Sequence, residues 1–137
     1  MGYTNAVAEK TNGYNIGTES KIAANSADFS QGTLVSEAGG VATTGDVLAG
    51  VSLTNKVFSA TNVTTDLDRV IYIPNETRQF YIMPITGGTI TLADQGKYFG
   101  ITAAQLVDGI SKSATVGKLQ MEKFISATKG VFSISNL

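Results

Sequence analysis

Asp66 and Asp68 form the one close pair of carboxylates in the sequence that could support chemistry. Two carboxylates can hydrolyse a glycosidic bond or bind a hard cation. A calcium-binding EF-hand loop counted from Asp66 would need glycine and glutamate at positions 71 and 77, but the chain has Ile71 and Thr77 there. We therefore interpret the pair as part of a solvated loop that precedes a strand at Val70.

Other catalytic arrangements lack their residues. The sequence contains no histidine and no cysteine, which excludes the commonest general base, the Ser-His-Asp and Cys-His arrangements, thiolate metal sites and disulfides. Gly40 and Gly45 are spaced as in a phosphate-binding loop, but Asp46 and Val47 follow where lysine and a hydroxyl residue are required. We therefore expect no enzymatic activity and no cofactor.

The composition is that of a weakly charged β protein. Ten basic and eleven acidic residues give a net charge of −1, and charged residues make up 15% of the chain. Neither sign forms a run, so we expect neither nucleic acid nor a membrane as a partner. Threonine, serine, asparagine and glycine separate the apolar runs, which favours strands and turns. The N-terminus does not have the pattern of a signal peptide, so we expect synthesis in the cytoplasm.

Short apolar segments between turn signals predict one mainly β domain over residues 31–137. The expected strands lie at residues 33–35, 47–53, 70–73, 80–85, 90–92, 98–101, 118–122 and 131–134. Strands at these intervals are typical of a small antiparallel β-barrel or a sandwich. Gly39 and Gly40 predict a hairpin turn. A Thr-x-x-Gln pattern from Thr102 predicts at most one short helix, ending at Gly109.

Residues 1–30 are the least periodic part of the sequence and predict an extended N-terminal arm. A disordered terminus is the alternative. The strands expected at residues 70–73 and 80–85 carry apolar residues on both faces. Such strands must be covered on two sides, either by another subunit or by the protein's own arm.

Tyrosine and arginine are enriched at the energetic centres of protein interfaces. The candidate protein-interface residues are Tyr3, Tyr14, Ile16, Tyr72, Arg78, Tyr81, Met83 and Tyr98. Ordinary packing of a tyrosine at the rim of a barrel explains each tyrosine equally well, so both interpretations stay open.

Three stretches carry a resemblance to a known family. Residues 84–101 place an apolar strand before Ala-Asp-Gln-Gly-Lys and an aromatic pair, and a Val-Asp-Gly turn follows at residues 107–109. Upstream, residues 45–52 read Gly-Asp-Val-Leu-Ala-Gly-Val-Ser. These motifs resemble those of the decoration (cement) proteins of tailed-bacteriophage capsids.

The resemblance implies a non-enzymatic virion protein that lies on the outer capsid surface, often as a trimer, and stabilises the shell by clamping neighbouring major capsid subunits. Its expected partners are the major capsid protein and copies of itself. A phage tail or head–tail joining subunit is the first alternative. A carbohydrate-binding β module is the second, although the absence of tryptophan disfavours it. An enzyme that uses Asp66 and Asp68 is the last.

Overall fold

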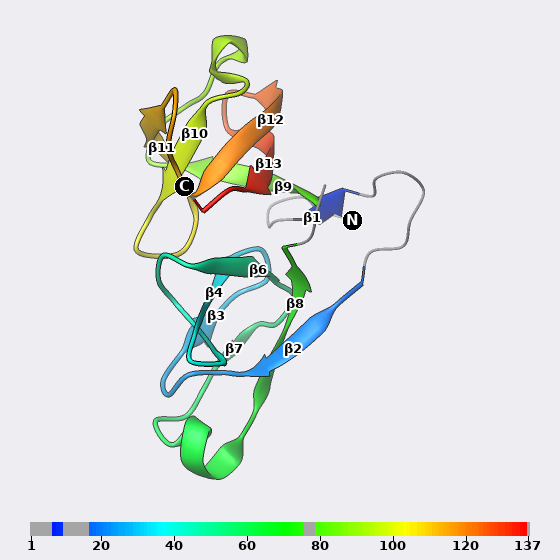
Figure 1. Ribbon diagram of the computed structural model, residues 1–137, viewed down its shortest axis with the longest axis vertical. Helices are drawn as coiled ribbons and strands as arrows, with labels where there is room; N and C mark the ends of the chain where they lie inside the picture. Colours follow the sequence, from blue (N-terminus) through cyan, green and yellow to red (C-terminus); the bar gives the residue numbers. More distant parts are fainter. Residues whose placement is uncertain (1–6, 10–16, 76–78, 137) are drawn as a thin grey trace.

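The computed structural model describes residues 7–9, 17–75 and 79–136 of the chain. Strands dominate these residues and form two parts that follow each other along the long axis of the molecule (Figure 1). We call residues 17–75 the N-terminal half and residues 79–136 the C-terminal half. The predicted mainly β fold class is confirmed.

The N-terminal half is built on a sheet with the strand order β2-β8-β6-β4-β5. These strands are β2 (Glu19–Ile22), β4 (Leu34–Ala38), β5 (Val41–Thr43), β6 (Leu48–Ser52) and β8 (Arg69–Pro74). A small second sheet pairs β3 (Asp28–Phe29) with β7 (Lys56–Val57), and the π-helix η1 (Asn62–Asp66) lies at the lower end of the molecule (Figure 1). A parallel bridge joins Ala23 to Ala42, so the two edges of the large sheet meet.

The C-terminal half is a closed β-barrel. Its described strands follow the order β9-β11-β10-β12-β13, and β13 pairs again with β9. They are β9 (Phe80–Thr86), β10 (Tyr98–Ile101), β11 (Val107–Ser113), β12 (Leu119–Ser126) and β13 (Lys129–Ile134). The pairs are antiparallel except β9 with β11. A barrel is therefore present where the sequence left a barrel and a sandwich open.

The alternating pattern of β9 explains how the sequence fills the barrel. Tyr81, Met83 and Ile85 are buried, and the residues between them are half-buried. Side chains of a strand point alternately to its two faces, so every second residue of β9 enters the interior. Gly109 of the neighbouring β11 allows this packing, because a β-carbon there would collide with Ile85.

A shared core joins the two halves. In the barrel, the rings of Phe99 and Phe132 meet edge to face with centroids 5.5 Å apart. The same apolar cluster continues into Leu34, Val51 and Ile73 of the N-terminal sheet. The halves are therefore packed against each other as one body.

A second cluster lies within the N-terminal half. It surrounds Phe29, Phe58 and Tyr72, and its other buried members include Ala23, Ala27 and Ala42. The two phenylalanine rings meet at a steep angle with centroids 6.3 Å apart. Small alanine side chains thus let the segments of this half approach closely.

The predicted hairpin is confirmed, whereas the predicted helix is wrong. Gly39 and Gly40 join β4 to β5 with φ angles of 59° and 79°, as a tight hairpin turn requires. No helix follows Thr102, because Gln105 has a left-handed φ of 62°, and β11 begins soon afterwards and runs through Gly109.

The structure also differs from the strand predicted at residues 90–92. The single-turn 3₁₀-helix η2 (Leu92–Asp94) begins at the end of that segment. Thr91 and Asp94 form a reciprocal capping box, in which each side chain bonds the backbone of the other residue. This box favours a helical turn over a continued strand.

Part of the predicted arm is built into the sheets. β2 pairs along β8, β3 pairs with β7, and Phe29 is buried. The boundary predicted between residues 30 and 31 therefore falls inside the packed N-terminal half. Nearer the N-terminus, β1 (Val7–Glu9) pairs along β9, whereas residues 1–6 and 10–16 lie outside the described residues.

Candidate functional site

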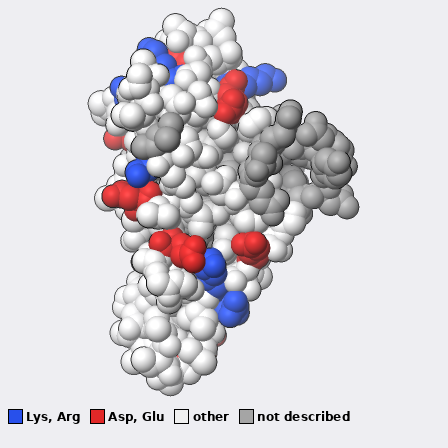
Figure 2. Space-filling model, viewed as in Figure 1, with Lys and Arg blue, Asp and Glu red and all other residues white. Residues whose placement is uncertain are grey.

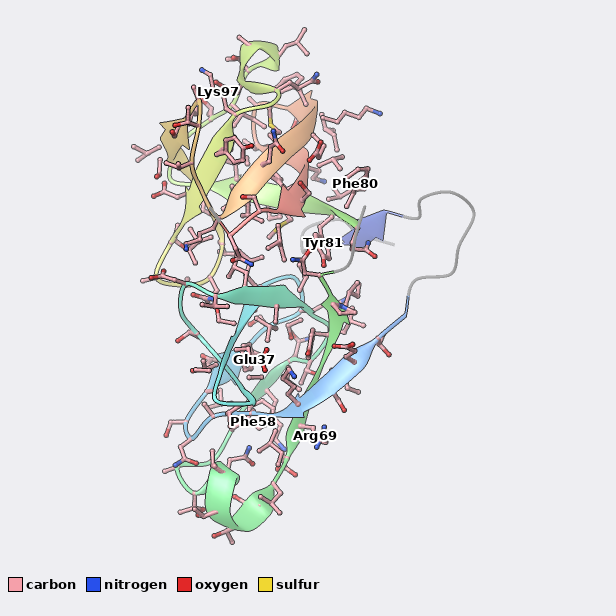
Figure 3. All side chains as sticks on the ribbon, viewed as in Figure 1. Glu37, Phe58, Arg69, Phe80, Tyr81 and Lys97 are labelled. Carbon is pink, nitrogen blue, oxygen red and sulfur yellow. The ribbon has the colours of Figure 1, made fainter. Side chains whose placement is uncertain are left out.

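Three of the candidate interface residues are core residues, which corrects their assignment. Tyr72, Tyr81 and Met83 are at most 1% exposed, so they cannot contact another molecule from the surface of this chain. Tyr81 lies where the halves meet (Figure 3), and its hydroxyl donates to the backbone oxygens of Ile73 and Pro74. Strand alternation places Tyr72, Tyr81 and Met83 inside, because each belongs to the face of its strand that enters a core.

Tyr72 also donates a hydrogen bond to the carboxylate of Glu19 at 3.2 Å. Burial and the negative charge of Glu19 disfavour the phenolate and raise the pKa of Tyr72 to about 12. Of the remaining candidates, Tyr98 is half-buried on β10. Tyr3, Tyr14, Ile16 and Arg78 lie outside the described residues.

Asp66 and Asp68 do not share a site. Asp66 accepts a hydrogen bond from the hydroxyl of Ser59, and Asp68 forms an ion pair with Lys56 at 2.8 Å. Both carboxylates are exposed. The two carboxylates are solvated and precede a strand, as predicted, but the predicted loop is only partly present: Asp66 ends the π-helix η1, and β8 begins at Arg69 directly after Asp68.

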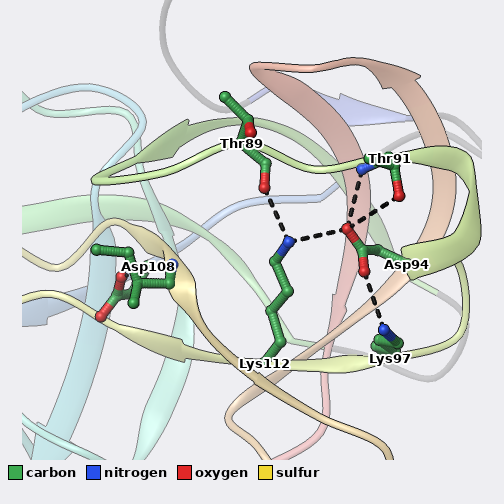
Figure 4. A network of polar contacts seen from close by, with 7 residues as sticks. Thr89, Thr91, Asp94, Lys97, Asp108 and Lys112 are labelled. Carbon is green, nitrogen blue, oxygen red and sulfur yellow. Dashed lines mark hydrogen bonds and ion pairs between the residues drawn. The ribbon is translucent and has the colours of Figure 1, made fainter.

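A buried carboxylate that the sequence analysis did not single out lies in the barrel (Figure 4). One oxygen of Asp94 accepts from Lys112 Nζ and the Thr91 N–H, both at 2.9 Å, and the other accepts from Lys97 Nζ at 3.1 Å. Lys112 also donates to the carbonyl of Thr89. The Thr-x-x-Asp spacing of the capping box was the available sequence signal.

The environment of Asp94 fixes its charge. Burial alone would raise the pKa of this carboxyl, but the hydrogen bonds from Lys112, Thr91 and Lys97 outweigh it and lower the pKa to about 2. A carboxylate that stays ionised and fully bonded cannot serve as a general acid near neutral pH. Its role is to tie η2 to β11.

A cavity of about 400 Å³ opens at the junction of the two halves. Three segments line it: the loop after β2, the end of β5 and the loop between β10 and β11. The lining residues are Ala24, Asn25, Ser26, Ala27, Asp28, Thr43, Thr44, Ala103, Ala104 and Gln105. Because the segments come from both halves, a molecule bound there would contact both.

Gln105 ties its own segment to the N-terminal half. Its buried side-chain amide donates to the carbonyl of Leu34 at 3.3 Å and the hydroxyl of Ser36 at 3.1 Å, and it accepts from the N–H of Gly45 at 3.2 Å. The left-handed backbone of Gln105 is uncommon for a residue with a side chain, and such residues are enriched at functional sites. Sequence reasoning assigned Gln105 to a helix and missed this contact.

Apolar side chains are exposed at both ends of the molecule. The helical turns η1 and η2 lie at opposite ends of the long axis (Figure 1). At the η1 end, Val63 and Leu67 are 37% and 50% exposed, and at the η2 end Leu92 is 65% exposed. Figure 2 shows almost no charged side chains at the η1 end on the face in view. Both ends therefore offer apolar surface to another molecule.

The comparisons with known proteins identify no relative: no protein family, curated protein or solved structure matches this chain. Within residues 7–9, 17–75 and 79–136, no cluster of three or more acidic, histidine or cysteine residues could hold a metal ion. In the same described part, no helix has the length and apolar character needed to cross a membrane.

Proposed function

We propose that this chain is a non-enzymatic structural protein of a tailed-phage virion, which binds the outer capsid surface and stabilises the shell by clamping neighbouring major capsid subunits. The observation that carries the proposal is the presence of exposed apolar side chains at both ends of one packed body. A protein that joins two neighbouring subunits needs two contact surfaces held at a fixed distance.

The junction between the halves supplies this fixed distance. The apolar cluster of the barrel extends into the N-terminal sheet. The side-chain amide of Asn136 also pairs with Leu48, accepting from its N–H at 3.0 Å and donating to its carbonyl at 3.1 Å. Together with the bonds of Gln105 to Leu34 and Ser36, these contacts oppose bending between the halves. Contact at one end thus positions the other end.

The energetics suit a protein that binds an assembled shell. Full burial of one leucine or valine side chain contributes about 1.5–3 kcal/mol, so Val63 and Leu67 at one end and Leu92 at the other offset part of the cost of association. Contact at both ends is available only where two subunits already lie side by side. Preferential binding to the assembled shell then stabilises that shell by linkage.

The experiment uses phage capsids (heads) that come from the same source as this protein and have been purified without it. We would measure binding of the chain and of the variants Leu67→Asn, Leu92→Asn and the double variant, together with the temperature at which the heads disassemble. Asparagine suits position 67, because that residue has a φ of 56° and asparagine tolerates the left-handed region. Each single variant should bind more weakly, and the double variant should not raise the disassembly temperature.

Val47→Asn is the matched control. Val47 is 63% exposed, but it directly precedes Leu48 of β6, which bonds to Asn136 of the C-terminal half, so it lies near the junction and not at either end. The Val47→Asn variant should bind like the unmodified chain. Unchanged binding of the double variant would contradict the proposal. Counting copies per particle by mass spectrometry separates the alternatives, since a simple fraction of the coat copy number fits decoration and a handful of copies fits a tail or joining subunit.

A further inference from the structure

We infer that the junction cavity is a socket for one lysine or arginine side chain of the partner protein, with Asp28 as its counter-charge. The identity of that partner as a capsid subunit rests on the proposed function. The chemistry of the socket rests on the cavity alone.

Asp28 lies in a place that can hold a ligand, and its carboxylate has no partner among the described residues. It is the one ionisable side chain among the residues that line the cavity. Two other aspartates of the described chain have cationic partners: Asp68 pairs with Lys56, and Asp94 pairs with two lysines. No hydrogen bond or ion pair engages the Asp28 carboxylate within residues 17–75 and 79–136. A cation in the cavity would supply the missing partner.

The remaining polar groups of the cavity suit a ligand that donates several hydrogen bonds. Ser26, Thr43 and Thr44 line the cavity, and no hydrogen bond with another described residue occupies their hydroxyls. A hydroxyl has two acceptor lone pairs, whereas ammonium and guanidinium groups carry only donors. An anion would meet the carboxylate of Asp28, and the lining has no aromatic side chain on which a sugar could stack.

The size and walls of the cavity also fit a long cationic side chain. Its volume of about 400 Å³ is at the small end of ligand pockets, which span roughly 300–1,000 Å³. Ala24, Ala27, Ala103 and Ala104 form the apolar part of the lining. Lysine and arginine pack their aliphatic stems along such surface while the charged group reaches a polar partner.

The walls are held in place before any ligand binds. Gln105 bonds to Gly45, which follows the lining residue Thr44, and to Leu34 of β4. On the other side, the Ala24 N–H donates to the carbonyl of Ala42 at 2.8 Å, and the Ala27 N–H donates to the carbonyl of Ala24. A preformed socket loses little conformational entropy on binding. The geometry therefore favours recognition of one side chain over loose electrostatic attraction.

The first test needs no capsid. The full chain labelled with ¹⁵N would be titrated with N-acetyl-arginine methylamide and with its neutral analogue N-acetyl-citrulline methylamide, and amide shifts would be followed by NMR. The arginine compound should shift the amides of Thr43, Thr44 and Ala104 and bind at least about tenfold more tightly than the citrulline compound, because a charge-assisted hydrogen bond is lost in the latter.

Two variants decide whether Asp28 is the counter-charge. Asp28→Asn should lose the preference for arginine, and its dispersed NMR spectrum would show that the fold is intact. Asp46→Asn is the matched control, since Asp46 is also exposed but does not line the cavity. It should keep the preference. Equal binding of the two compounds, shifts elsewhere on the surface, or an unchanged Asp28→Asn variant would overturn the inference.

The second test asks whether the socket takes part in binding to the capsid. On heads that lack this protein, Asp28→Asn should bind about tenfold or more weakly, because the partner's buried cation loses its counter-charge, and Asp46→Asn should bind normally. Normal binding of Asp28→Asn would overturn the role of the socket in capsid binding. If the unmodified chain does not bind heads, the proposed function fails, and the arginine titration still decides the chemistry of the cavity.

Discussion

The two halves of the molecule close their sheets by different means. In the barrel, β13 pairs with β9 over four consecutive residues, from Lys129↔Pro84 to Phe132↔Tyr81. In the N-terminal half, the edges of the large sheet meet at one bridge between Ala23 and Ala42. The barrel is therefore closed by a backbone ladder, whereas the N-terminal half requires additional contacts.

The side chain of Asn62 supplies these contacts. Its amide nitrogen donates to the carbonyls of Ala23 and Asp68 at 2.7 and 3.0 Å, and its amide oxygen accepts from the Asp68 N–H at 3.0 Å. The residue is fully buried. An amide side chain has the same donor and acceptor as a peptide unit, so Asn62 takes the place of a neighbouring strand.

The interiors differ in the same way. The barrel is filled by large side chains, among them Met83, Phe99 and Phe132. The cluster of the N-terminal half contains three alanines around its aromatic residues. Stability should therefore depend mainly on apolar volume in the barrel and on a few polar contacts in the N-terminal half, and each dependence can be tested by substitution.

The largest expected effect is in the barrel. Phe132→Ala should lower the free energy of unfolding by about 3–5 kcal/mol, because it removes a fully buried ring and leaves a cavity beside Phe99. Since the barrel core continues into Leu34 and Val51, both halves should still unfold in one transition. Urea unfolding followed by circular dichroism and by NMR would measure this. Two separate transitions would contradict a shared core.

Asn62→Ala should destabilise the protein by about 2–3 kcal/mol, because buried backbone groups of Ala23 and Asp68 lose their partners. The loss should be local. Amide hydrogen exchange should speed up in β2 and β8 and stay slow in the barrel.

Asn62→Asp is the control, since it keeps the oxygen that accepts from Asp68 but loses both donated bonds. It should not restore slow exchange in β2. If exchange in the barrel accelerated as much as in β2, the two halves would not differ in the way proposed.

The same contrast explains what the sequence could predict. The apolar run at residues 80–85 and the paired Gly39 and Gly40 report local geometry, and the predicted strand and hairpin were both confirmed. The closing contacts of the N-terminal half join residues far apart in the chain, such as Asn62 and Ala23. One asparagine among many in a polar sequence gives no local sign of such a role.

Gln105 shows the same limit at the candidate site. The Thr-x-x-Gln pattern predicted a helix cap, but tertiary contacts with Ser36 and Gly45 fix Gln105 in a left-handed conformation that no helix contains. The junction cavity follows from these contacts. It could not be predicted from sequence, because its lining segments are far apart in the chain and the third of them joins the other two only when the halves pack.

The ion pairs of Asp94 provide a pH test of the barrel. The unfolded pKa is near 3.8 and the folded pKa is about 2, so the stabilisation is present above about pH 4 and is lost as the pH falls toward 2. A shift of this size corresponds to about 2 kcal/mol. Asp94→Asn should therefore be less stable than the unmodified chain at pH 6, and the difference should shrink by pH 2. A difference independent of pH would contradict this role.

The smallest expected effect concerns the ion pair between Lys56 and Asp68 of the N-terminal half. Both side chains are nearly half exposed, at 46% and 49%, so water and salt screen their attraction. Lys56→Met should change the free energy of unfolding by less than about 1 kcal/mol, even though Lys56 also lies over the ring of Phe58.

Lys112→Met in the barrel is the matched comparison, and it should cost more. Asp94 is only 6% exposed, and without Lys112 it would keep a buried charge with one fewer partner. Urea unfolding in low salt and in about 0.5 M salt would measure the stability of both variants. At the higher concentration, salt screens exposed charges that are more than a few ångströms apart. The small cost of Lys56→Met should vanish in high salt, whereas that of Lys112→Met should persist, because buried pairs are screened little. Equal losses of stability in Lys56→Met and Lys112→Met would mean that ion pairs stabilise both halves to the same extent.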